Sequence, residues 1–113
     1  MQAFFNESDL ERLPPEKMHW VNLSAELYPD GQRIRVQLEF TPFLKSPVLE
    51  LTVRDAQGNT AATTTIIEPF TWRLELTLHL RDPRIDAAGL QLEAVLLYPD
   101  LGEIDRRELA VPS

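Results

Sequence analysis

The sequence contains no cysteine. A disulfide framework, a thiolate nucleophile and a cysteine-based metal site are therefore excluded, and one reason to place the protein outside the cell is removed. No apolar run approaches the roughly 18 to 20 residues that a membrane-spanning helix needs. Residues 1–13 lack a basic stretch followed by an apolar run, so they do not read as a signal peptide. We expect a soluble, cytoplasmic protein, although a fragment of a longer chain would have the same features.

Positive charge is scarce. The formal net charge is −7, Lys17 and Lys45 are the only lysines, and no cluster of basic residues offsets the acidic ones. A surface of this kind repels phosphate backbones and anionic lipids. We therefore expect neither nucleic acid nor a membrane as a partner, and we assign the charge to solubility.

Residues that carry chemistry are few. The four glycines lie in turns and form no phosphate-binding loop, and no serine lies in a nucleophile elbow. His19 and His79 lack the close spacing of zinc ligands. Acidic pairs such as Asp82 with Asp86, or Glu103 with Asp105, could support acid–base catalysis, but loops of acidic proteins contain such pairs by chance. We expect no enzyme and no cofactor.

What the chain does have is alternation of apolar and polar residues, which predicts β-strands. Its 113 residues suffice for one domain, and 43% of them are hydrophobic, enough for a core. Turn residues separate about seven segments, the usual number for a small sandwich. The expected strands are residues 20–28, 33–40, 48–55, 60–67, 73–80, 90–98 and 103–111.

This spacing predicts an all-β fold, a single antiparallel sandwich that resembles immunoglobulin and fibronectin type III domains in general layout. The cysteine pair of antibody domains is absent. A C2-type sandwich or a small barrel is the alternative. In the first strand, alternation places Val21 and Leu23 on one face and Trp20 and Tyr28 on the other. The second face could be an outward stripe, but we favour the interpretation that it packs on the N-terminal segment.

The N-terminal extension, residues 1–18, precedes the predicted sandwich domain, residues 19–113. Ser8 to Glu11 fits a capping box, which predicts a short helix that ends at the prolines at 14 and 15. The apolar side chains of the extension include Phe4, Phe5, Leu10 and Leu13. They could form a docking peptide for a partner. We favour the other interpretation, that they cover an open end of the protein's own sandwich.

Successive connections of an antiparallel sandwich alternate between its two ends. One end would gather Asp30, Asp55, Asp82 and Asp86, which are weak candidates for calcium ligands. Nearby arginines can neutralise them, and aspartate is an ordinary turn residue, so we favour no metal.

The opposite end would present Phe43 and Leu44, with Phe70 possible either there or in the core. Apolar loop residues at such an end either plug the core or form a binding surface, and the sequence leaves both open.

The leading functional hypothesis is a non-catalytic protein-interaction module. It would act through the loops at one end, through the N-terminal segment, or by self-association of an edge strand such as residues 60–67. The alternative is a calcium- or carbohydrate-binding module, because flat rings such as those of Trp20, Trp72, Tyr28 and Tyr98 can stack on sugars. A carboxylate-based hydrolase is the least favoured.

Overall fold

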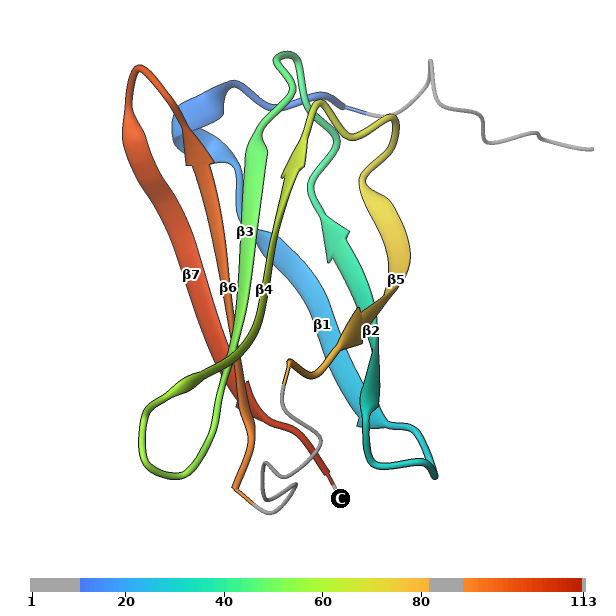
Figure 1. Ribbon diagram of the computed structural model, residues 1–113. Helices are drawn as coiled ribbons and strands as arrows, with labels where there is room; N and C mark the ends of the chain where they lie inside the picture. Colours follow the sequence, from blue (N-terminus) through green and yellow to red (C-terminus); the bar gives the residue numbers. More distant parts are fainter. Residues whose placement is uncertain (1–10, 82–88, 113) are drawn as a thin grey trace, which may run out of the picture.

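Two antiparallel β-sheets pack face to face in the computed structural model, which describes residues 11–81 and 89–112 (Figure 1). One sheet has three strands in the order β1-β2-β5, and the other has four in the order β4-β3-β6-β7. The strands are β1 (Trp20–Leu27), β2 (Arg33–Phe40), β3 (Val48–Arg54), β4 (Thr60–Ile67), β5 (Arg73–His79), β6 (Gln91–Tyr98) and β7 (Gly102–Ala110). The prediction of an all-β sandwich of about seven strands is thus confirmed.

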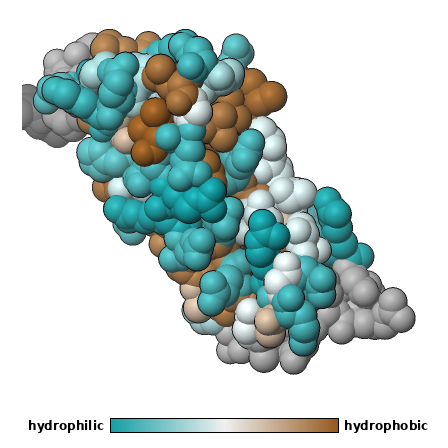
Figure 2. Space-filling model, turned by 90° about the vertical axis from the view of Figure 1, so that its left-hand side faces the viewer, coloured by the Kyte–Doolittle hydropathy of each residue, from teal (hydrophilic) through white to brown (hydrophobic). Residues whose placement is uncertain are grey.

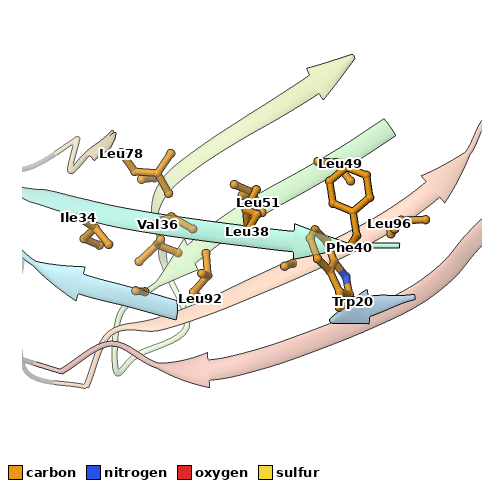
Figure 3. Packing of buried hydrophobic residues seen from close by; sticks show 14 of the residues in the cluster. Trp20, Ile34, Val36, Leu38, Phe40, Leu49, Leu51, Leu78, Leu92 and Leu96 are labelled. Atoms are coloured by element: carbon orange, nitrogen blue, oxygen red, sulfur yellow. The ribbon is translucent and has the colours of Figure 1, made fainter. Parts of the chain in front are cut away.

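The core lies between the sheets and is built from the inward positions of the strands. Ile34, Val36 and Phe40 of β2 are fully buried, as are Leu49 and Leu51 of β3. Figure 3 shows these side chains meeting across the interface between the layers. Each such side chain stabilises the fold by about 1.5–3 kcal/mol relative to exposure, so the alternation in the sequence translates directly into the sandwich.

The beginning of β1 differs from the prediction. The register with β2 shifts between Trp20 and Asn22, so Val21 is an extra residue that the partner strand does not match. Such a bulge reverses the facing of the residues before it. Trp20 is consequently fully buried, with its ring edge-on to Phe40 at 5.8 Å, whereas Val21 is 48% exposed. The prediction that Trp20 lies on the face opposite the core was therefore wrong, whereas Tyr28 does lie on the opposite face.

Trp20 also joins the two sheets along one side of the sandwich. Its backbone N–H donates to Oδ2 of Asp105 in β7 at 2.8 Å, and its carbonyl accepts from Nη2 of Arg107 at 2.7 Å. Bonds to charged partners are stronger than neutral ones, so this side is firmly closed.

The N-terminal extension forms only a single turn of 3-10 helix, η2 (Pro15–Lys17), in its described part, residues 11–18. Pro15 begins this turn, because a first helical position tolerates a missing N–H. The predicted capping box at Ser8 falls outside the described residues. Between residues 11 and 81 and between 89 and 112, no helix is long and apolar enough to cross a membrane.

Candidate functional site

The outer face of the β1-β2-β5 sheet is uniformly polar. Below the bulge, side chains of the three strands alternate between core and solvent, and the register aligns the outward ones in rows across the sheet. One row contains Asn22, Glu39 and Arg73. The next contains Ser24, Gln37 and Glu75.

These two rows line an open hollow of about 350 Å³ in the sheet surface. Ser24 Oγ donates to Gln37 Oε1 at 3.2 Å, and Arg73 Nε lies 3.4 Å from Glu39 Oε2. The Arg73 side chain is 74% exposed, so this pair adds little to stability. Its exposed guanidinium can be reached by a ligand that lies on the sheet. The hollow therefore offers hydroxyl, amide, carboxylate and guanidinium groups on a rigid strand scaffold.

Further along the same face, Tyr28 lies among cations. The guanidinium of Arg33 is 4.4 Å from the ring centroid, and that of Arg35 is 5.9 Å away. The phenol oxygen is 3.2 Å from Oγ1 of Thr77. Hydrogen bonds with Thr77 and then Arg35 lower the pKa of Tyr28. Arg35 also pairs with Glu75 at 3.3 Å, which links the tyrosine to the hollow.

The calcium candidates are engaged within their own turns. Asp30 Oδ1 accepts the N–H of Gln32 at 2.9 Å, and Oδ2 lies 2.7 Å from Arg33 Nε; these contacts lower the pKa of Asp30. Asp55 Oδ1 accepts from the backbone of Asn59 at 2.9 Å. The two turns lie at the same end, as predicted. However, the turn at Asp30 joins two strands of the three-stranded sheet, and the turn at Asp55 joins two strands of the four-stranded sheet (Figure 1).

Asp82 and Asp86 lie outside the described residues. Elsewhere in the described chain, no group of three or more potential metal-binding side chains comes together.

The carboxylates proposed for hydrolysis have structural partners. Glu103 Oε1 is 2.7 Å from Arg106 Nη2, and this contact lowers the pKa of Glu103, whereas a general acid needs a raised one. Both oxygens of Asp105 accept backbone N–H groups, from Trp20 and Arg106.

The histidines are far apart. The carbonyl of His19 accepts from Thr41, beyond one end of β2, whereas His79 pairs with Arg33 at the other end. About 26 Å of strand therefore separates them, which is too far for both to bind one metal ion.

The opposite end of the sandwich is apolar. Phe43 is half-buried and stacks on Phe40 at 6.1 Å, so it plugs the core, whereas Leu44 is 67% exposed. Phe70 is fully exposed, in the β4–β5 connection. Figure 2 shows hydrophobic surface gathered at this upper end. Leu13 packs half-buried against the core, and Phe4, Phe5 and Leu10 lie outside the described residues.

Sequence reasoning did not identify the hollow. Its residues, such as Gln37 and Glu75, show only the ordinary parity of solvent-facing side chains. The hollow forms because the polar positions of β1, β2 and β5 become neighbours in one sheet. The order of the strands in a sheet cannot be read from the sequence.

Comparison with known proteins gives the fold alone. No protein-family model matches the chain, and no curated protein matches it. Among solved structures, a β-glucuronidase from Ruminococcus gnavus in complex with D-glucuronic acid superposes with a TM-score of 0.53 and 17% identity, over 86% of this chain and 16% of its own.

Two further solved structures also superpose on this chain. A glycosyl hydrolase family 2 member from Bacteroides cellulosilyticus has a TM-score of 0.53 at 15% identity, covering 81% of this chain and 15% of that one. An FMN-binding β-glucuronidase from Faecalibacterium prausnitzii has a TM-score of 0.52 at 12% identity, covering 85% and 17%. The chain thus matches a sandwich that makes up about one sixth of much longer chains.

Proposed function

We propose that this chain is a non-catalytic β-sandwich module that binds carbohydrate in the hollow of the β1-β2-β5 sheet. The observation that carries the proposal is the hollow itself, where six polar side chains from three strands converge. They are Asn22, Ser24, Gln37, Glu39, Arg73 and Glu75. The occurrence of the same fold within carbohydrate-processing proteins adds support.

The chemistry of the hollow suits sugar hydroxyls. Amides both donate and accept, carboxylates accept, and a guanidinium donates in a fixed fork, so adjacent hydroxyls can be bound in pairs. Asn22 and Gln37 supply the amides and Arg73 the fork. The hollow is open rather than enclosed, which suits a sugar chain lying across the sheet more than a small molecule that must be buried.

The charge of the hollow limits the sugar class. Glu39 pairs with Arg73 and Glu75 pairs with Arg35, so both carboxylates of the hollow are already balanced by guanidinium groups. A uronic acid would add a third carboxylate that these two ion pairs leave no further cation to balance. We therefore propose a neutral sugar as the ligand.

Calorimetric titration with neutral oligosaccharides tests the proposal. Gln37→Ala removes a central amide, and losing one or two hydrogen bonds to a ligand weakens binding roughly 10-fold. Gln57→Ala, in the β3–β4 turn, is the matched control and should bind as the unaltered protein does. The absence of binding heat with any neutral sugar, or equal loss in both variants, would contradict the proposal.

A protein-interaction module is the second candidate. It is favoured by the exposed Leu44 and Phe70 at the apolar end, because solvent-facing clusters of large apolar side chains mark contact surfaces. A protein that binds the unaltered chain through this surface should no longer bind the variant Phe70→Ser, a substitution that leaves the hollow intact.

We infer an immunoglobulin-like sandwich, supported by the count and antiparallel pairing of the strands. It departs from the constant-type arrangement in one strand, because β4 pairs with β3 instead of joining the sheet that contains β5.

A further inference from the structure

Four exposed side chains form what we term the apolar pole. Leu44 lies in the β2–β3 connection, Ile67 at the end of β4, Phe70 in the β4–β5 connection and Leu101 in the β6–β7 turn. Their exposed fractions are 67%, 69%, 101% and 49%. Single exposed apolar residues are ordinary, but an end of the sandwich that carries four of them is a surface on which an apolar segment can be buried.

The chain backbone enters the sandwich at this same end. Leu13 forms a parallel bridge with Phe43: its N–H donates to the Pro42 carbonyl at 2.9 Å, and its carbonyl accepts from Leu44 at 3.1 Å. Leu13 is therefore fixed beside the β2–β3 connection.

Arg12 contacts two connections at this end. Its guanidinium lies 5.7 Å from the ring centroid of Trp72, and Nη1 donates to the carbonyl of Phe43 at 3.3 Å. Trp72 closes the β4–β5 connection that carries Phe70. Arg12 thus lies between the two connections that supply Leu44 and Phe70.

Residues 1–10 have the reach and the composition to cover this surface. Ten residues span up to about 33 Å when extended. Three of them, Phe4, Phe5 and Leu10, are large and apolar. A tethered segment also has an effective concentration in the millimolar range, which lowers the affinity that docking requires.

We infer that residues 1–10 dock on the apolar pole of their own chain, with Phe4 and Phe5 against Phe70. A second copy of the chain is a poorer occupant, because each copy carries a net charge of −7 and the two would repel. A separate partner would have to displace a segment that is already tethered beside the surface.

A double-mutant cycle in urea tests the inference. The variants are Phe4→Ser with Phe5→Ser, Phe70→Ser, and all three together, in the full chain. Docking predicts that the first two each lower the unfolding midpoint and that the triple variant falls no further than the lower of them, because the same contact is lost. Asn6→Ser and Gln57→Ser, at polar positions in the segment and at the opposite end, are controls that should leave the midpoint unchanged.

The other outcomes overturn the inference. If Phe70→Ser leaves the midpoint unchanged or raises it, the pole faces solvent. If the effects of the segment and of Phe70 add, the two do not touch. Light scattering tests whether a second copy of the chain covers the pole. If the unaltered chain is a dimer and Phe70→Ser is a monomer, the occupant is a second copy and not residues 1–10.

Discussion

Val21 is the residue at which alternation along β1 breaks, and its effect on Trp20 is large. The bulge brings Trp20 into the core against Phe40 and leaves Val21 half in solvent. Sequence alone could not reveal this, because the run from Trp20 to Asn22 fits either facing. Only the pairing with β2 decides which residue is the extra one.

Substitutions at these neighbours should have very different effects. Trp20→Ala removes a fully buried ring and should lower the free energy of unfolding by about 3–5 kcal/mol. Val21→Ser, at a half-exposed position, should change it by no more than about 0.5 kcal/mol. Urea denaturation measures both. The regular alternation expected from sequence predicts the reverse order, so equal or inverted losses would argue against the bulge.

The two tyrosines should titrate separately. Burial, and secondarily the charge of Glu16, raises the pKa of Tyr98 to about 12, and its hydroxyl donates to the Lys45 carbonyl at 2.8 Å. The pKa of Tyr28 is instead lowered by its hydrogen bonds with Thr77 and Arg35. Absorbance of the phenolates against pH should show one group below 10 and one near 12. Tyr98→Phe should remove the later step alone.

Tyr98 also links stability to alkaline pH. Its phenol is protonated in both states below about pH 10, and between about 10 and 12 the unfolded chain loses the proton first. The unfolded state then binds fewer protons, so stability should fall as pH rises through this window. The fall should be smaller in Tyr98→Phe, and an identical fall in both proteins would show that Tyr98 does not contribute.

At the scale of elements, the sequence predicted the strands well. Alternation is strongest in β2 and β3, where inward and outward residues differ sharply, and their bounds agree with the prediction to within one residue. The predicted N-terminal helix starts at Ser8, outside the described residues, and it is not confirmed: residues 11–18 contain only the turn Pro15–Lys17.

Residues 11–17 should stabilise the sandwich although they belong to no strand. Removing residues 1–17 deletes the two hydrogen bonds of Leu13 and its half-buried side chain. A loss of about 2 kcal/mol from these contacts should lower Tm by roughly 5–15 °C. Calorimetry of this variant beside one that lacks only residues 1–10 isolates the contribution of 11–17. Equal melting of the two variants would show that the bridge to Phe43 contributes nothing.

At the scale of the whole molecule, the two ends of the sandwich have different chemistry. One end carries hydrogen-bonded turns around Asp30 and Asp55, and the other carries the apolar pole. The sequence predicted which connections share an end, because that follows from antiparallel order. It could not predict which strands become neighbours, and the hollow around Gln37 depends on that order. The candidate site could therefore not be predicted from the sequence, whereas the two-sheet arrangement could.

The bulge in β1 also has an evolutionary meaning. Val21 is unmatched by β2, so a chain lacking it would join Trp20 directly to Asn22 with regular alternation and the same core. Descendants of a common ancestor could gain or lose one residue here without disturbing the sandwich, whereas the same change within β2 would turn every following side chain to the wrong layer. The register shifts in the same way at Ala61 of β4 and Ile104 of β7. Differences in length among related chains should therefore collect at these three positions and in the turns, rather than inside β2.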